Sequence, residues 1–155
     1  MTITVPRDPI LVHATAIAID GRAVLLRGPS GAGKSDLALR LIDGGARLVA
    51  DDQVELRRAG ERVVVTAPAA IAGLIEVRGL GILRVEAVAE ATLALLVDLV
   101  SSAEVDRLPE IRREEVLGVS APMIALSPFE ASAAAKLRLA LSAFSADSVL
   151  AIIRR

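Results

Sequence analysis

The sequence predicts a single α/β domain, residues 1–155, built on a mixed β-sheet. A glycine-rich phosphate-binding pattern lies between an apolar strand-like run and a helix-forming run. Short β-branched runs joined by tight-turn signals indicate antiparallel hairpins. With 155 residues, 54% of them hydrophobic, the chain can bury one core and has no room for a second of similar size.

The chain begins with strand signals. Residues 10–19 are apolar and β-branched around His13. Asp20-Gly21 follows as a hairpin signal before the apolar residues 23–27. We therefore expect these two runs to form a pair of antiparallel strands.

A helix and a short strand come next. Residues 37–42 carry apolar side chains among good helix formers, and Gly44-Gly45 supplies the stop, so a helix of about three turns is expected. Residues 47–50 indicate a buried strand that ends at Asp51 and Asp52. A hairpin is predicted from the runs 54–58 and 62–66.

The second half of the chain is less regular. Gly79 and Gly81 interrupt the apolar run 75–83, which suggests a bulge or a close backbone approach. Residues 93–100 alternate too little for a half-exposed strand and are expected at the centre of the sheet. The remaining expectations are one or two helical turns at 69–74, a polar loop with a short helical segment at 101–113, a strand at 122–126 and a helix at 131–144.

Composition argues against several classes of function. Lys and Arg total 18 and Asp and Glu total 19, so the net charge of −1 gives no basic field for nucleic acid. No apolar run reaches the roughly 18 to 20 residues of a membrane span, and the N-terminus lacks signal-peptide features. Cysteine is absent, which fits a reducing compartment, so we expect a cytoplasmic protein. Phe129 and Phe144 are the only aromatic residues, so a nucleotide base would be held by aliphatic or polar contacts.

The strongest chemical signal is a P-loop pattern, G-x-x-x-x-G-K-S, after a strand and before a helix. Its glycines allow backbone N–H groups to converge on a phosphate, and the helix adds its positive end. The lysine is expected to neutralise β- and γ-phosphate oxygens, and the serine to bind the Mg²⁺ that bridges them. The predicted ATP-binding residues are Gly28, Pro29, Ser30, Gly31, Ala32, Gly33, Lys34 and Ser35.

Other polar residues are candidates for catalysis. Asp51 and Asp52 follow Lys34 by only 17 and 18 positions, which is earlier than the metal-binding carboxylate of ordinary P-loop ATPases. One of the two is expected to be a general base. The alternative is that both belong to a solvated turn. His13 is either catalytic or a structural histidine. Glu76 and Arg78 are two apart, so on a strand they share a face, as an internal ion pair or an active-site pair.

The motifs in this order resemble the catalytic domain of the HPr(Ser) kinase/phosphorylase family. The resemblance covers roughly residues 13–85 and rests on His13, the P-loop, R-L-V-A-D-D at 47–52 and E-V-R-G-L-G-I-L at 76–83. A weaker D-R-L match lies at 106–108.

The resemblance implies a fold like that of phosphoenolpyruvate carboxykinase and a serine kinase that uses ATP and Mg²⁺. Its acceptor would be an HPr-like phosphocarrier protein of the sugar phosphotransferase system. Lys34 would hold the transferred phosphate, Ser35 and Glu76 would bind Mg²⁺, and Arg78 would support the Glu76 segment. His13, Asp51 and Asp52 would be catalytic, with Asp52 favoured over Asp51 as the base. The family's reverse reaction uses phosphate and releases pyrophosphate.

Departures from the family pattern leave alternatives open. We expect the family's N-terminal domain to be absent, and its homo-oligomer, a hexamer, is left undecided. Residues 127–132 lack the arginine of the family's P-G-R-N-like stretch, for which Arg138 is a candidate replacement. The alternatives to a protein kinase are a nucleotide-binding regulatory module that has lost catalysis and a small-molecule P-loop kinase.

Overall fold

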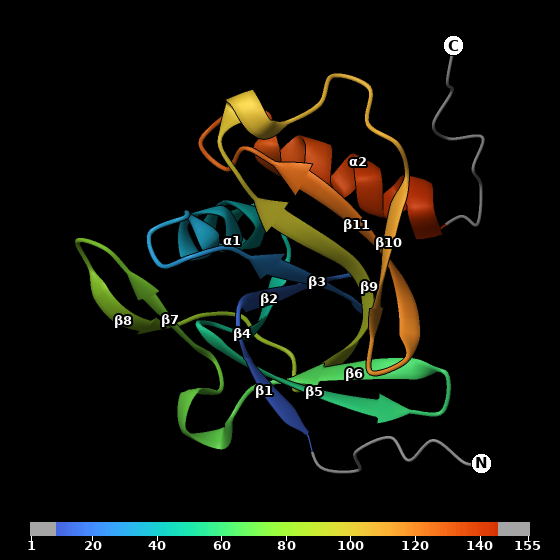
Figure 1. Cartoon of the computed structure of the whole chain (residues 1–155). Helices are drawn as coiled ribbons and strands as arrows, with labels where there is room; N and C mark the ends of the chain where they lie inside the picture. Colours follow the sequence, from blue (N-terminus) through green and yellow to red (C-terminus); the bar gives the residue numbers. More distant parts are fainter. Residues whose placement is uncertain (1–8, 146–155) are drawn as a thin grey trace.

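A mixed nine-stranded sheet and a separate two-stranded hairpin make up the β structure of residues 9–145, the part of the chain that the computed structural model describes (Figure 1). The strands are β1 Ile10–His13, β2 Thr15–Ile19, β3 Arg22–Arg27, β4 Arg47–Ala50, β5 Gln53–Ala59, β6 Arg62–Thr66, β7 Leu74–Val77, β8 Gly81–Arg84, β9 Glu90–Leu99, β10 Arg112–Val116 and β11 Val119–Leu126. The helices are α1 Lys34–Asp43 and α2 Ala133–Ser145, with 3-10 turns η1 Ala69–Ile71 and η2 Ser102–Glu104.

Strand β9 occupies the centre of the sheet, as the lack of apolar-polar alternation in residues 93–100 predicts. It pairs in parallel with β3 along one side. Along its other side it pairs antiparallel with β6 near its start and parallel with β11 near its end. The sheet is therefore mixed, and the carboxyl ends of β3, β9 and β11 lie at one edge.

The apolar run 10–19 forms two strands, not the single strand expected. β2 pairs with β3 as predicted, and also with β4, whereas β1 leaves this pair and joins β5. The path of the sheet runs β1-β5-β6-β9-β3-β2-β4, so the consecutive strands β1 and β2 lie near its opposite ends. This requires the sheet to curl back on itself (Figure 1).

Two groups of buried side chains stabilise the curled sheet. One lies between the sheet and the two helices and includes Leu26, Leu37, Leu48 and Leu137. The other fills the opposite face and contains many small residues, among them Ala14, Ala16 and Ala18, which allow strands to approach closely inside the curl. The first group holds β3 and α1 together, and with them the loop that joins them.

The second half of the chain departs from expectation at three places. Residues 75–83 do not form a bulged strand: β7 and β8 are a hairpin, and the positive φ angles of Gly79 (93°) and Gly81 (105°) bend the chain between them. β10, Arg112–Val116, was not predicted; it begins inside the segment 101–113 expected to be a loop and continues beyond it. β11 begins at Val119, before the expected start at 122. The turn η2 and the helix α2 were predicted.

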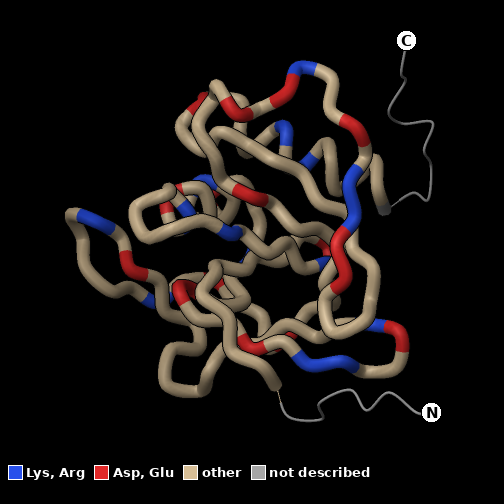
Figure 2. The backbone as a smooth tube through the Cα atoms, viewed as in Figure 1, with Lys and Arg blue, Asp and Glu red and all other residues tan. Residues whose placement is uncertain are grey.

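Charge and hydropathy agree with the composition. Basic and acidic segments are interspersed along the backbone (Figure 2). No helix among residues 9–145 is long and apolar enough to cross a membrane.

Candidate active site

The P-loop connects the end of β3 to the start of α1. Gly33 is the N-cap of α1 with φ of 100°, a backbone conformation that L side chains rarely adopt. A Cβ at Gly28 would lie 2.9 Å from the Cβ of Ala32, so this position also requires glycine. These glycines bring the first N–H groups of α1 to one point, the arrangement that binds a phosphate at a helix N-terminus.

The side chain of Lys34 folds back over the loop. Its Nζ donates hydrogen bonds to the carbonyl oxygens of Gly28 at 2.6 Å and Pro29 at 2.9 Å, and the residue is only 6% exposed. An ammonium group has three donors, and these bonds use two. The positive charge is therefore held at the mouth of the loop, where the predicted phosphate contact requires it.

Asp51 is the buried carboxylate of the site. It directly follows β4 and is 7% exposed. Its Oδ1 accepts hydrogen bonds from Ser35 Oγ at 2.7 Å and Thr15 Oγ1 at 3.1 Å, and its Oδ2 accepts one from the backbone N–H of Glu76 at 3.0 Å. Asp51 thus ties β2, β7 and the first turn of α1 together. Two hydroxyl groups and one backbone N–H therefore donate hydrogen bonds to this carboxylate.

Asp52 has the opposite environment. Its backbone has a positive φ of 69°, and its side chain is 68% exposed. Its Oδ1 lies 2.7 Å from Nε2 of His13, whose side chain is 49% exposed. The backbone N–H of Asp52 donates to Thr15 Oγ1 at 3.3 Å, so the same hydroxyl contacts both aspartates. The adjacent carboxylates therefore differ: Asp51 is committed to internal bonds, and Asp52 is accessible to an incoming group.

The predicted magnesium ligands suit that metal. Mg²⁺ prefers oxygen ligands and is usually held by one or two carboxylates together with substrate phosphates and water. Ser35 offers a hydroxyl beside the Asp51 carboxylate, and Glu76 is an exposed carboxylate whose backbone is tied to Asp51. Within residues 9–145 no three His, Asp or Glu residues could hold a metal by themselves, so the phosphates would complete the ligand set.

The expected strand-face pairing of Glu76 and Arg78 is wrong. β7 ends at Val77, so Arg78 begins the turn of the hairpin, and both side chains are exposed. No ion pair joins them within the described residues. The glycine-containing turn ends the period-two alternation on which the expectation depended.

Arg27 forms an ion-pair cluster that the sequence reasoning missed. It is the residue before Gly28, and its guanidinium donates to both carboxylate oxygens of Asp98, with a shortest distance of 2.8 Å. It also donates to both oxygens of Glu114, at 2.5 and 3.0 Å. The hydrogen bond to Glu114 raises the pKa of Arg27, and the same bond lowers the pKa of Glu114. The cluster ties the end of β3 to β9 and β10. A signal was available in the sequence, since Arg27 directly follows the apolar run 23–26.

Arg138 does not replace the missing arginine at residues 127–132. Its guanidinium donates to the carbonyl oxygen of Leu41 at 2.8 Å, at the C-terminal end of α1. The P-loop is at the other end of this ten-residue helix, about 15 Å away. Arg40 instead contacts the 127–132 segment, donating to the carbonyl oxygens of Pro128 and Glu130.

Comparison with known proteins gives a consistent result. The model of the HPr Serine kinase C-terminal domain matches residues 8–137. An HPr kinase/phosphorylase from Exiguobacterium sp. (strain ATCC BAA-1283 / AT1b) is 48% identical over 75 residues, covering 48% of this chain and 24% of that protein. One from Listeria monocytogenes serotype 4a (strain HCC23) is 48% identical over 77 residues, covering 49% of this chain and 25% of that protein.

The fold is also found among solved structures. The HPr(Ser) kinase/phosphatase from Coxiella burnetii aligns with a TM-score of 0.79 and 28% identity, over 89% of this chain and 97% of that chain. The matched region spans about a quarter of the length of the curated relatives. Since the family model covers most of the sequence and the structural alignment extends over nearly the whole fold, the chain belongs to the HPr serine kinase C-terminal domain family.

Proposed function

We propose that the chain is an ATP-dependent serine kinase whose acceptor is an HPr-like phosphocarrier protein. The observation that carries the proposal is the difference in burial and hydrogen-bond partners between the two aspartates beside the P-loop. Asp51 is buried and bonded to Ser35, and Asp52 is exposed and bonded to His13. One carboxylate thus supports the phosphate end of the site, and the other is left for the acceptor. A role for ATP fits the cytoplasmic location expected above.

The proposed reaction begins with the acceptor serine next to Asp52. The serine oxygen attacks the γ-phosphorus of ATP, its proton passes to the Asp52 carboxylate, and the bond to the β-phosphate oxygen breaks to release ADP. Lys34 and the N–H groups at the start of α1 stabilise the charge on the transferred group. Mg²⁺, held by Ser35 and Glu76 with the phosphates, would neutralise further phosphate charge.

His13 would act through Asp52. Its Nε2 lies 2.7 Å from the Asp52 carboxylate, so it orients the base. If the reverse reaction occurs, the same Asp52, now protonated, would return its proton to the serine oxygen as phosphate attacks the phosphoserine to form pyrophosphate.

The surroundings of Asp52 favour a protein over a small molecule as acceptor. Both Asp52 and His13 are well exposed, so no enclosed cavity surrounds the base. The backbone of Glu76 links Asp51 to the hairpin β7–β8, which carries the exposed apolar side chains Leu80 (71%) and Ile82 (69%). Exposed apolar groups beside an open polar site are typical of protein contact surfaces.

The decisive experiment measures phosphoryl transfer from labelled ATP, with Mg²⁺, to a purified HPr. The expected result is label on a serine of HPr, lost when that serine is changed to alanine. Lys34→Ala is expected to lower the rate at least about a hundredfold, and Lys136→Ala, which removes the only other lysine, should leave it unchanged. ATP binding without transfer to HPr would overturn the kinase proposal and favour the regulatory module; transfer only to small hydroxyl compounds would favour the small-molecule kinase.

A further inference from the structure

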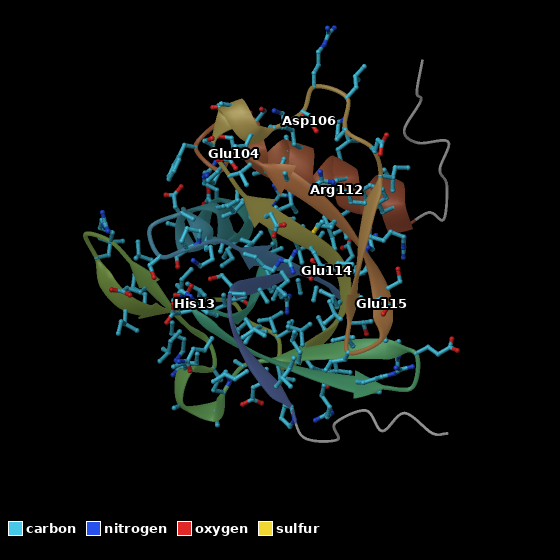
Figure 3. The ribbon with its side chains drawn as sticks, viewed as in Figure 1. His13, Glu104, Asp106, Arg112, Glu114 and Glu115 are labelled. Atoms are coloured by element: carbon cyan, nitrogen blue, oxygen red, sulfur yellow. The ribbon has the colours of Figure 1, made fainter. Side chains whose placement is uncertain are left out.

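The side chain of Arg27 takes no part in the reaction proposed above, yet its guanidinium is held from three strands. Asp98 lies on β9 beside Arg27 in the parallel register, and it accepts hydrogen bonds from Nε at 2.8 Å and Nη2 at 3.3 Å. Glu114 of β10 accepts from Nη1 at 2.5 Å and Nη2 at 3.0 Å, and the sulfur of Met123 on β11 lies 3.1 Å from Nη2. In Figure 3, Glu114 lies on the β9 side of β10. One side chain thus joins β3 to the three strands that follow it across this side of the sheet.

Two forked contacts fix the direction of this side chain. A guanidinium is planar and pairs with a carboxylate through two parallel N–H donors, so each fork sets an orientation as well as a distance. Arg27 makes two such forks, one to Asp98 and one to Glu114. In the described part of the chain β3 and β10 are not paired through their backbones, so the fork to Glu114 adds a connection that the sheet itself lacks. The end of β3 is therefore fixed more closely than by strand pairing alone.

The residue that follows Arg27 holds the lysine of the P-loop. The carbonyl oxygen of Gly28 accepts the shorter hydrogen bond from Lys34 Nζ, at 2.6 Å. A Cβ at Gly28 would lie 3.5 Å from the Cβ and from the carbonyl oxygen of Leu99, so the P-loop begins in contact with the end of β9. The ring of Pro29 fixes its own φ and restricts the chain immediately after Gly28. Once Arg27 is fixed, the Gly28 carbonyl that anchors Lys34 has little freedom.

We propose that Arg27 is a positioning residue for Lys34. By fixing the end of β3 it fixes the Gly28 carbonyl, which directs the ammonium group of Lys34 toward the transferred phosphate. Two of the three ammonium donors are used within the loop, so the directions of those two bonds determine where the third donor points. The inference rests on the proposed function, because it takes the transferred phosphate as the partner of Lys34.

The first test observes Lys34 directly and needs neither nucleotide nor acceptor. The chain has only two lysines, so protein labelled with ¹³C at the lysine ε-carbon gives NMR signals from two ε-CH₂ groups, and Lys136→Ala assigns them. Because Nζ of Lys34 is held by two carbonyl oxygens, we expect its two ε protons to have distinct chemical shifts. Arg27→Gln, which removes the charge, should move these shifts toward one averaged value.

Arg27→Lys should have the same effect, because an ammonium group keeps the charge but cannot form the forks. The matched control is Arg57→Gln, which changes an exposed arginine on β5 and should leave the Lys34 signals as they are. The side chains of Arg27, Asp98 and Glu114 are partly exposed, at 27%, 38% and 40%, so we expect the variants to fold. Urea denaturation checks this. A Lys34 spectrum that is unchanged in either folded Arg27 variant would overturn the role assigned to the forked guanidinium.

The second test asks whether Arg27 acts through Lys34. Arg27→Gln is expected to weaken the binding of inorganic tripolyphosphate, measured by calorimetry, about three- to tenfold, and to lower kcat for transfer to HPr about ten- to hundredfold. In a Lys34→Ala background the same change should affect neither quantity, because the group that it positions is gone. No loss in either background, or an equal loss in both, would overturn the inference. A wild-type protein that shows the expected binding cycle but transfers no phosphate to HPr would overturn the proposed function alone.

Discussion

Ser35 Oγ and Asp51 Oδ1 lie 2.7 Å apart, joined by a hydrogen bond between the first turn of α1 and the residue that follows β4. Because the serine hydroxyl gives its hydrogen to Asp51, the lone pairs of its oxygen remain for another partner. The bond thus orients a metal ligand from within the protein. Only Asp51 takes part in this bond, so the adjacent Asp52 can have a different role.

The first prediction compares the two aspartates. Asp51→Asn places an amide NH₂ group among three donors, and we expect the free energy of unfolding to fall by about 1–3 kcal/mol. Asp52→Asn changes an exposed side chain, so stability should stay within about 0.5 kcal/mol. Its phosphoryl transfer to HPr should slow about 10²- to 10⁴-fold. Urea denaturation and initial transfer rates measure the two effects.

Asp43→Asn is the matched control, since it removes an exposed carboxylate from the far end of α1 and should alter neither quantity. If Asp52→Asn transfers phosphate at the wild-type rate, Asp52 is not the base. If Asp51→Asn is as stable as the wild type, the hydrogen bonds from the three donors to residue 51 do not need a charged carboxylate to stabilise the fold.

The second prediction concerns the coupling of His13 to Asp52. If His13 only orients the base, His13→Ala should slow transfer roughly ten- to hundredfold without weakening ATP binding. In an Asp52→Asn background the same change should have almost no effect, because the group that it orients is gone. Single-turnover rates of the four proteins form the cycle, and additive effects would show that His13 acts independently of Asp52.

The strand, loop and helix of the P-loop could be predicted because local signals and the tertiary structure agree there. The apolar run before Gly28, the helix formers after Lys34 and the stop at Gly44 all favour one arrangement, and α1 forms at Lys34–Asp43. The position of Asp51 and Asp52 after a short buried strand followed from the same local reasoning.

The rest depends on partners distant in sequence. The division of residues 10–19 into β1 and β2 arises because β1 pairs with β5, which no periodicity reveals. β10 was missed because its charged sequence suits an exposed strand paired only with β11 within the described residues. The turn between them uses Leu117 and Gly118, both with positive φ, in place of the usual Asn-Gly. The different environments of Asp51 and Asp52 likewise depend on hydrogen bonds with Thr15 and Glu76, which lie on two other strands.

The third prediction tests the hairpin β7–β8 as the contact surface for the acceptor. Ile82→Ser removes an apolar side chain that is 69% exposed, so the fold should be unaffected. We expect KM for HPr to rise about three- to tenfold, with KM for ATP unchanged. Leu139→Ser, on α2, is the control with a comparably exposed side chain, 72%. Equal KM values for HPr in both variants and the wild type would exclude Ile82 from the contact surface.

The fourth prediction uses the ion-pair cluster of Arg27. The hydrogen bond from Arg27 lowers the pKa of Glu114 in the folded protein from its ordinary value of 4.5. The charged form is therefore favoured by folding, so the contribution to stability is present above about pH 4.5 and is lost as the pH falls through the lowered value. Glu114→Gln should destabilise the protein at pH 6, and its difference from the wild type should shrink as the pH falls from 4.5 to 3.

The control for this comparison is Glu115→Gln on the same strand, since Glu115 is exposed and has no ion pair within residues 9–145. Urea denaturation at several pH values measures each difference from the wild type, which cancels the acid response of the other carboxylates. A gap between Glu114→Gln and the wild type that is equally large at pH 6 and pH 3 would mean that the charge of Glu114 is not its source. A gap that closes on acidification would show that the guanidinium clamp before the P-loop depends on an ionised Glu114.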